Sequence, residues 1–484
     1  MATTLEALEA PPAGARKKRI AEHPSVAERA RLGKVARAKV PRSVIGQFEP
    51  GPSRPDPVAL LEEQAASRVP ELVPIRYGRM LVSPFAFFRG AALGMAADLA
   101  ATPTSGLTVQ ACGDAHLSNF GVFGAPDRTL VFDVNDFDET LPGPWEWDVK
   151  RLAASLAIAG RERGFTLKER SVVVTAAAAG YRTEMTALAG SQNLDVWYRR
   201  GDVTKLLADF RNASKATDRK RTKAALAKAR TRDSMQAYTK LTHLVDGEPR
   251  IISDPPLIVP IEELVPGLDG NDLLEWARTA LTKYRRSLQD DRRHLLEQFR
   301  FVHLARKVVG VGSVGTRAWI ALLLGRDDSD PLLLQVKEAQ ASVLERFTAK
   351  SQFANQGERV VAGQRVMQAA TDIFLGWQRE DAGLDAQAHD FYVRQLRDWK
   401  GSLEIEQTTP TSLRNYAEVC GWTLARAHAR SGDRIAIAAY LGKSAAFDQA
   451  VSAFSELYAD QNERDYASLQ KAAADGRITV ESGL

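Results

Sequence analysis

Apolar residues in this chain recur mainly at helical spacing, and short strand-like runs interrupt them at a few places. Residues 83–100 have apolar positions at helical spacing, and Ser83 followed by Pro84 marks the helix start. A further helix is expected over Ser25–Lys39. The runs LTVQAC and TLVFD then favour two short strands, with the loop GDAHLSNFG between them.

The second half of the chain contains a β-rich island among helices. Helices are predicted from Leu167 to Arg300, with a break at GEPRIISDPPLIVP. From Arg306, the segments RKVVGVGSVGTRAWIALLLG and PLLLQVKEA predict three consecutive antiparallel strands. We expect helices again in the segments ASVLERF, GQRVMQAATDIFLGW, FYVRQLRDWK and YAEVCGWTLARAHARSG.

These patterns predict an α+β fold with four regions. We expect a partly disordered arm over residues 1–60 and a helical lobe over 61–300. A small β-hairpin lobe over 301–400 and a helical region over 401–484 complete the chain.

Composition favours a cytoplasmic globular protein. Hydrophobic residues make up 44% and charged residues 26%, which is typical of a soluble chain. There is no apolar run long enough for a membrane span, so we expect no membrane partner. The basic N-terminal stretch lacks the apolar segment of a signal peptide. The two cysteines, Cys112 and Cys420, predict neither a disulfide framework nor a zinc site.

The net charge of +5 is spread unevenly. The segment Val203–Lys240 holds eleven Lys and Arg residues against three Asp. A polyanion is one partner for such a stretch, but no aromatic interleaving or recognition motif accompanies it. We interpret the segment as a solvated helix face and expect no nucleic-acid partner. The sequence does not indicate an oligomeric state.

The first candidate site is acidic. Asp114 and Asn119 lie in the loop after the first predicted strand, Asp133 ends the second strand, and Asp136 follows it. If these two strands pair as a hairpin, the loop and the strand end converge. Carboxylate and amide oxygens are the ligands that Mg²⁺ shares with phosphates and water. A remaining carboxylate could accept a proton from a hydroxyl group.

Two other interpretations apply to the acidic stretch. A calcium loop starting at Asp133 would place Asp138 where glycine is required and Pro144 where a bidentate Glu is required, so it is excluded. A single Asp in a loop is more often a turn or helix cap than a ligand. That simpler explanation weakens because one geometry accounts for several of these residues.

The acidic stretch resembles the catalytic loop of the aminoglycoside phosphotransferase and choline kinase branch of the kinase-like superfamily. The pattern is roughly His-Gly-Asp-x-His-x-x-Asn, and residues 112–119 here read CGDAHLSN. A strand ending in Asp133 and a helix opening with Asp148 follow in the same order. Cys112 replaces the first His of the pattern. This resemblance implies a two-lobed, helix-rich protein-kinase-like fold.

The resemblance also implies roles for individual residues. Asp114 would be the catalytic base, and His116 would support the loop or lie near the metal. Asn119 and Asp133 would hold Mg²⁺, and Asp148 would brace the loop. Asp136 competes with Asp133 for the metal role, because Asp133 sits better at the strand end and Asp136 sits better relative to Asp148.

A glycine-rich segment supplies the second candidate site, for the nucleotide. Kinases cover the phosphates with a glycine-rich loop and pair them with a strand lysine. Lys337 in LLLQVKEA matches that lysine, and Glu345 in the next predicted helix is its expected partner. No Gly-Lys-Ser/Thr sequence is present, so this is not a Walker loop. The residues expected to approach phosphate are Gly310, Gly312, Ser313 and Gly315.

The order of these motifs is reversed relative to ordinary kinases. The glycine-rich segment follows the acidic loop by roughly two hundred residues, whereas in kinases it precedes the loop. Circular permutation accounts for such an order. The hypothesis predicts that Lys337 and Gly312 face Asp133 across a cleft.

Over its full length the chain also resembles the uncharacterised bacterial family called domain of unknown function 2252. The shared phrases include FFRG, GDAHLSNFG, FDVNDFDE, GVGSVGTR and LLLQVKEA. That family brings no known activity, so function is predicted from the site. We predict an ATP- and Mg²⁺-dependent phosphotransferase acting on a small hydroxylated molecule. The alternatives are nucleotidyl transfer, nucleotide binding without turnover, and a metal-dependent hydrolase.

Overall fold

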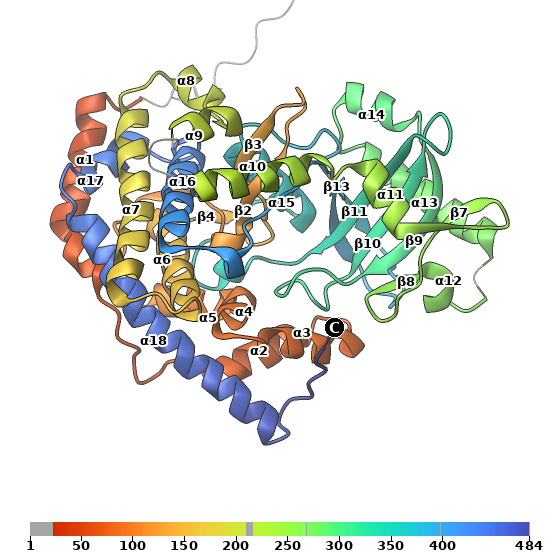
Figure 1. Ribbon diagram of the computed structural model, residues 1–484, viewed down its shortest axis with the longest axis horizontal. Helices are drawn as coiled ribbons and strands as arrows, with labels where there is room; N and C mark the ends of the chain where they lie inside the picture. The colour runs from red at the N-terminus through yellow and green to blue at the C-terminus, as the bar shows by residue number, and fades with distance from the viewer. Residues whose placement is uncertain (1–22, 210–215, 268, 397, 484) are drawn as a thin grey trace, which may run out of the picture.

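The computed structural model describes residues 23–209, 216–267, 269–396 and 398–483. It has an α+β fold, with most long helices on one side and a large sheet on the other (Figure 1). The part of the predicted arm before residue 23 lies outside the described residues. No helix among the described residues is both long and apolar enough to cross a membrane.

The first half of the chain builds most of the helical side and the acidic loop. Its α-helices are α1 Val26–Lys39, α2 Pro57–Ala65, α3 Val73–Met80, α4 Pro84–Gly90, α5 Ala92–Ala100, α6 Trp145–Glu162, α7 Leu167–Ala189, α8 Asn193–Tyr198, α9 Val203–Asp209, α10 Ala216–Arg230 and α11 Ser234–Leu241. Its strands are β1 Thr108–Ala111, β2 Phe120–Gly124, β3 Leu130–Val134, β4 Leu141–Pro144 and β5 Gly201–Asp202. Short 3₁₀ turns occur at η1 Arg42–Gly46, η2 Pro70–Leu72 and η3 Leu117–Asn119.

The second half builds the sheet and then returns to the helical side. Its strands are β6 Thr242–Val245, β7 Glu248–Ile251, β8 Ile258–Pro260, β9 Arg300–Lys307, β10 Ala318–Leu324, β11 Pro331–Ala339, β12 Gly376–Glu380 and β13 His389–Gln395. Its helices are α12 Ile261–Leu264, α13 Gly270–Arg285, α14 Asp290–Leu296, η4 Val343–Arg346, α15 Gln356–Met367, η5 Ile405–Gln407, α16 Pro410–Ala429, α17 Arg434–Leu441 and α18 Ala446–Ala474.

The predicted three-stranded island is confirmed, and the sheet is larger than predicted. Six strands are hydrogen-bonded in the order β12-β13-β11-β10-β9-β8. The neighbouring strands are all antiparallel. Strands β9, β10 and β11 are the three predicted from the sequence, and the glycine-rich segment joins the first two of them.

The predicted helix at FYVRQLRDWK is wrong. This segment begins in strand β13, which lies between β11 and β12. Phe391 pairs with Glu338 and Val393 with Val336. The apolar run is too short for its sequence pattern to distinguish a helix from a strand, and pairing within the sheet selects the strand. The helix predicted over 363–377 also ends early, at Met367, and strand β12 begins at Gly376.

The predicted pairing around the acidic loop is also wrong. LTVQAC forms β1, which pairs with β4, and TLVFD forms β3, which pairs with β2. Strand β2 arises directly after Asn119 and was not predicted. The loop and the end of β3 still converge, because β2 turns back onto β3 and pairs Gly121 with Asp133.

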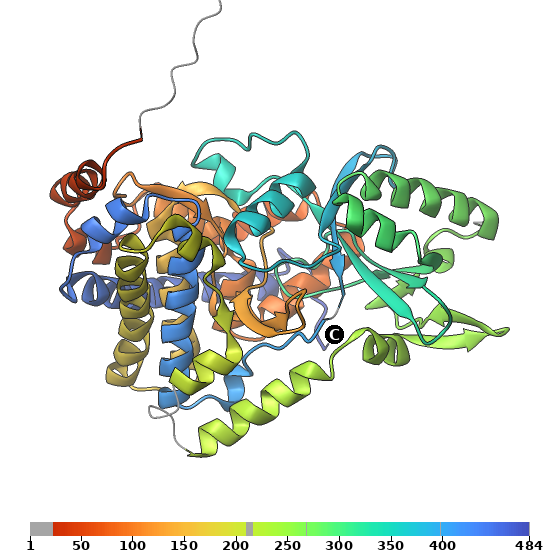
Figure 2. The same cartoon turned by 90° about the horizontal axis from the view of Figure 1, so that it is seen from above.

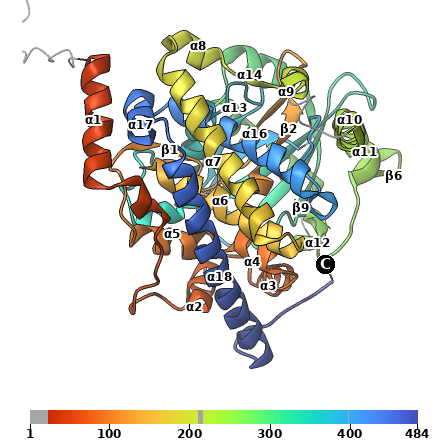
Figure 3. The same cartoon turned by 60° about the vertical axis from the view of Figure 1, so that its left-hand side comes forward.

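A core of packed helices forms the helical side next to the acidic loop. Helix α6 is buried along nearly its whole length and packs against α7, α16 and α18. Helix α18 is long and crosses the helical side toward α2 (Figure 3). Helices α7 and α16 approach closely, and a Cβ atom at Gly421 would collide with the Ala177 carbonyl.

The segment expected to be a partly ordered arm contains a helix that packs on the helical side. The predicted helix over Ser25–Lys39 is confirmed as α1, with Ser25 as its N-cap. It packs on α17. Further along, Arg54 forms ion pairs with Asp98 and Asp465.

The basic stretch Val203–Lys240 includes α9, α10 and α11, while residues 210–215 lie outside the described part. Helix α10 runs between the helical side and the sheet side (Figure 2). Its described side chains are mostly exposed from Arg219 onward, as expected of a solvated helix face.

We predict that Gly421→Ala destabilises the protein by about 1–3 kcal/mol, because the helices must separate to admit a methyl group. Urea unfolding measures this change. Gly94→Ala is the matched control, since no atom lies within 4 Å of the added Cβ. That substitution within α5 should be neutral or stabilising. Equal effects at the two positions would contradict the close approach.

Candidate functional site

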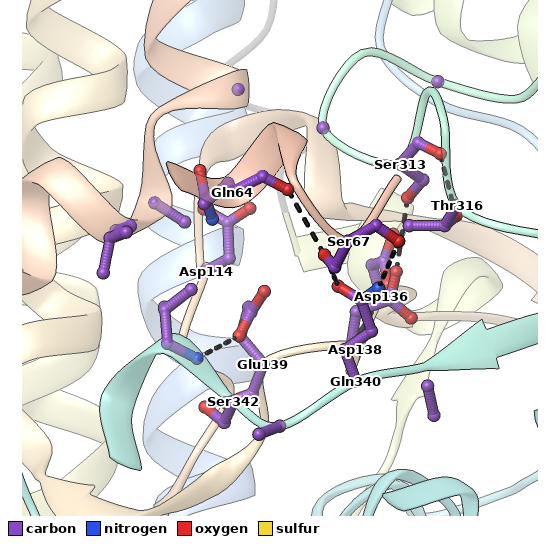
Figure 4. A pocket seen from close by; sticks show the side chains of 18 of the residues that line it. Gln64, Ser67, Asp114, Asp136, Asp138, Glu139, Ser313, Thr316, Gln340 and Ser342 are labelled. Atoms are coloured by element: carbon purple, nitrogen blue, oxygen red, sulfur yellow. Dashed lines mark hydrogen bonds between the residues drawn. The ribbon is translucent and has the colours of Figure 1, made fainter. Parts of the chain in front are cut away.

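One cavity of about 710 Å³ lies where the acidic loop, the glycine-rich segment and the helices α2 and α4 meet. Figure 4 shows Asp114 and Glu139 on one side of it and Asp136, Asp138 and Ser313 on the other. The structure thus brings together two motifs that are roughly two hundred residues apart in the sequence. The predicted residues that line the cavity are Asp114, His116, Asn119, Asp136, Gly310, Gly312, Ser313 and Glu345.

The carboxylate of Asp114 is held in one orientation. Arg151 of α6 donates from Nε to Oδ1 of Asp114 at 2.8 Å. The amide nitrogen of Asn119 donates to the Asp114 carbonyl at 2.7 Å. Arg151 is itself fixed by the Phe88 carbonyl and ring. Arg151 therefore occupies Oδ1, while Asp114 itself lines the cavity.

Asp148 holds the backbone of the loop. Its carboxylate accepts hydrogen bonds from the amides of Cys112, at 2.6 Å, and Gly113, at 2.9 Å. On the other side it lies 3.0 Å from Nε2 of His428. Gly113 has a φ of +83°, and a Cβ there would collide with the Glu139 carbonyl. These contacts are those of the brace that the kinase resemblance implies.

His116 lies beside Asp114 in a buried position. Its Nε2 is 3.8 Å from Oδ2 of Asp114. Burial lowers the pKa of His116 to about 3, although Asp114 acts in the opposite direction. The imidazole is therefore neutral at physiological pH, and its buried Nδ1 has no hydrogen-bond partner.

Asp133 and Asp136, the two candidates for a metal ligand, lie in different surroundings. Asp133 is 2% exposed, forms an ion pair with Arg426 and contributes nothing to the cavity wall. Burial raises its pKa despite that guanidinium. Asp136 lines the cavity. Burial would raise the pKa of Asp136, but the nearby charges of Lys337, Arg394 and Lys400 together outweigh burial and keep the pKa below its ordinary value.

Lys337 reaches the acidic loop from strand β11. Its Nζ lies 2.6 Å from Oδ2 of Asp138 and 3.8 Å from Oδ1 of Asp136. Tyr392 donates to Oδ1 of Asp138 at 2.6 Å, and the Ser313 hydroxyl donates to Oδ2 at 3.3 Å. Burial opposes the charge on Lys337, but the two carboxylates raise its pKa above the ordinary value.

The expected ion pair between Lys337 and Glu345 does not form within the described residues. Glu345 lies in the short turn η4 and lines the cavity, with its Oε1 buried and without a partner. Asp138 takes the place of the expected partner. It was visible in the sequence as part of the acidic stretch, but its side chain could be assigned to Lys337 only in three dimensions.

The glycine-rich loop between β9 and β10 is tied to the N-terminal helices. Arg79 donates to the Gly310 carbonyl at 2.7 Å, and the Val69 amide donates to the Gly315 carbonyl at 2.8 Å. Both glycines have positive φ, +65° and +89°. Gly315 packs against Arg68 and lies outside the cavity wall, unlike the other three predicted residues of this loop.

Glu139 is a cavity residue that sequence reasoning missed. Its Oε2 accepts a hydrogen bond from the Val343 amide at 2.7 Å. Burial raises its pKa to about 7, and the charges of Asp114 and Asp138 act in the same direction. Glu139 therefore exchanges a proton near neutral pH inside the cavity. Its position directly after the acidic stretch was the only sequence signal.

The oxygen atoms of the cavity wall suit a metal ion that takes only part of its ligands from the protein. Within the described residues no group of three or more His, Cys, Asp or Glu side chains is arranged to hold a metal ion. Asp136 and Asn119 line the same cavity and offer oxygen atoms. Mg²⁺ typically binds one or two protein oxygens and completes its shell with phosphates and water. The residues present therefore fit Mg²⁺ accompanied by a phosphate ligand.

The chain matches the model of a known protein family. The model of the family described as an uncharacterized protein conserved in bacteria, DUF2252, matches residues 68–472. The resemblance to this family that was predicted from the sequence is confirmed over these residues. Neither the curated proteins nor the solved structures contain a match to this chain.

Replacing Asp148 by Ala should destabilise the protein by about 3–5 kcal/mol, because it strips a buried charged group from its partners. Two amides and His428, which is fully buried, would lose their acceptor. Denaturant unfolding measures the loss. Asp127→Ala, in an exposed turn, is the control and should change stability much less. A similar loss for both variants would argue against the brace.

Glu139 should make stability depend on pH. Its pKa is about 7 in the folded protein against an ordinary value of 4.5, so the folded state binds more protons between these values. Stability should therefore fall as pH rises from about 4.5 to 7, by up to about 3 kcal/mol. Urea unfolding across this range measures the slope. Glu139→Gln should remove this part of the slope, and an unchanged slope would refute the assignment.

Proposed function

We propose that this chain, which belongs to the DUF2252 family, transfers a phosphoryl group from ATP, with Mg²⁺, to the hydroxyl group of a small molecule. One observation carries the proposal. The acidic loop and the glycine-rich loop line one cavity, and the strand lysine of the same sheet reaches the acidic loop. Phosphoryl transfer needs this combination, because its catalysis is mainly positioning and charge stabilisation.

The arrangement of the sheet supports a two-lobed kinase-like fold with permuted order. In protein kinases a glycine-rich loop precedes a lysine on the third strand. Here the glycine-rich loop joins β9 to β10, and Lys337 lies on the next strand, β11. The catalytic-loop residues precede this sheet in the chain, so the lobes are exchanged in sequence while the motifs meet in space.

The acidic stretch supports the same proposal. Asp136 and Phe137 match the first two residues of the Asp-Phe-Gly motif, whose aspartate binds Mg²⁺ in kinases. Phe137 is buried in the core, whereas Asp136 lines the cavity. We therefore assign the metal to Asn119 and Asp136. Asp133, committed to Arg426, is assigned a structural role.

Each residue then has a stated task. Asp114 accepts the proton of the acceptor hydroxyl while that oxygen forms a bond to the γ-phosphorus and the bond to the ADP oxygen breaks. Arg151 keeps Asp114 oriented for this step. Mg²⁺, when bound, would neutralise charge on the phosphate oxygens. Glu139, whose pKa is about 7, is a second site at which a proton can be held.

Asp138 marks a difference from the kinase pattern. In kinases the strand lysine pairs with a glutamate of the following helix. Here the carboxylate beside Lys337 belongs to the acidic stretch itself, two residues after Asp136. A single short segment thus provides both the proposed metal ligand and the partner of the lysine.

Asp114→Asn should keep the contact with Arg151 and remove the proton acceptor. We expect ATP binding within a factor of about three of wild type and turnover lower by roughly 10²–10⁴. A screen of hydroxylated metabolites with γ-labelled ATP identifies a substrate, and its turnover is then compared between wild type and the variant. Asp202→Asn, away from the cavity, serves as the control.

Label position distinguishes the alternatives. Transfer of the γ label supports the proposal, and transfer of an α label would replace it with nucleotidyl transfer. Full activity of the Asp114 variant would show that the base is assigned incorrectly.

A further inference from the structure

Two arginine side chains line the cavity without a carboxylate partner. Arg68 follows α2 and Arg89 lies on α4. Arg68 is only 9% exposed, and it donates to the Val314 carbonyl of the glycine-rich loop. The Nε atoms of Arg68 and Arg89 are both buried and have no hydrogen-bond partner. Among the described residues, neither guanidinium forms an ion pair.

The other cations near the cavity are already committed. Lys337 is paired with Asp138 and contributes nothing to the cavity wall. Arg346 lines the wall but is paired with Glu63. Lys350 also lines the wall, and its side chain is exposed to solvent. The guanidinium groups of Arg68 and Arg89 are therefore the positive charges without an ion-pair partner that a ligand in this cavity meets, as far as the described residues go.

The carboxylates that face these arginines have partners of their own. Asp114 and Asp136 attract Arg89 from a distance, but Asp114 is bound by Arg151 and Asp136 lies beside Lys337. They do not replace a direct counter-ion for Arg89.

Arg68 also lacks a direct counter-ion among the described residues. Glu139, Glu338 and Asp138 attract it from a distance. Glu338 is bound by Arg317, and Asp138 is bound by Lys337. Glu139, with a pKa of about 7, is only partly ionised at neutral pH.

A third arginine adds to the positive charge behind this wall. Arg76 is fully buried and donates to the carbonyl of Gly90 and to the side-chain oxygen of Gln64. Burial lowers the pKa of Arg68, Arg76 and Arg89, because a guanidinium loses hydration inside the protein. Arginine nevertheless stays charged in proteins, so an uncompensated charge persists until an anion binds.

We propose that Arg68 and Arg89 form a phosphate-binding subsite beside the glycine-rich loop. The planar guanidinium groups suit the bidentate recognition of phosphate oxygens. Gly312 and Ser313 line the same cavity and place backbone beside the arginines. Phosphate held here contacts arginines from the N-terminal helices, while Lys337 remains paired with Asp138.

Two sources of the phosphate fit this chemistry. It belongs either to ATP, in which case the inference rests on the proposed function, or to an acceptor that already carries a phosphate group. The second source narrows the acceptor to phosphorylated hydroxyl compounds.

Calorimetric titration of the full chain tests the subsite. The titrants are Mg-ATP, inorganic phosphate, and inorganic phosphate added to ATP-saturated protein. Arg89→Gln should weaken the binding of the relevant ligand by about ten- to a hundredfold, since a charge-assisted hydrogen bond is lost. Arg346→Gln, in the same wall but paired with Glu63, should change it by less than about threefold.

The pattern of losses identifies the source. If the phosphate comes from ATP, the Arg89 variant binds Mg-ATP weakly, and ATP excludes inorganic phosphate from the wild type. If it comes from the acceptor, ATP binding is unchanged, and the ATP-saturated wild type still binds phosphate in an Arg89-dependent manner. Either pattern supports the subsite.

The inference is overturned if wild type binds neither Mg-ATP nor inorganic phosphate. It is also overturned if the Arg89 variant binds each of these ligands as tightly as the Arg346 variant does. Binding that depends on Arg89 without any turnover would retain the subsite and reject the phosphotransferase. Thermal unfolding provides the folding check. Without anions, Arg89→Gln should melt no lower than wild type, because it removes an uncompensated charge, and its stabilisation by phosphate should be lost. If this variant does not fold, Arg89→Lys replaces it.

Discussion

A buried ammonium group links the two sides of this molecule. Lys337 is nearly inaccessible to water, and burying a charge is costly unless a counter-ion accompanies it. Asp138, fixed from its other side by Tyr392, provides that counter-ion. This contact joins strand β11 of the large sheet to the acidic stretch. Arg359 of α15 reinforces it by donating to the backbone carbonyls of Asp138 and Gln340.

The acidic residues of this region fall into two groups according to their surroundings. Asp133 and Asp148 each face a buried cation or imidazole and hold backbone in place. Asp114 and Asp136 share the cavity wall, where a ligand can reach them. Residues of the same type therefore serve as structural anchors or as cavity-lining groups, and their surroundings decide which.

The sequence predicted several of the residues that line the cavity, but not all of them. The residues of the acidic and glycine-rich loops were identifiable because their chemistry depends on residue type and local spacing. Asp133 and Asp136 could not be separated, because the distinction rests on Arg426, nearly three hundred residues away. The partner of Lys337 and the role of Arg68 were out of reach for the same reason. The strand at 389–395 was missed because only its neighbours in the sheet select strand over helix.

The glycine-rich loop is anchored to a segment that precedes every recognised motif. Backbone and arginine contacts join it to residues 69 and 79, and α2 and α4 form part of the cavity wall. A shortened chain beginning at Asp114 would keep the loop aspartates and Lys337, yet it would lose one wall and the anchors of the loop. The part of the chain that forms this cavity therefore begins well upstream of the acidic loop.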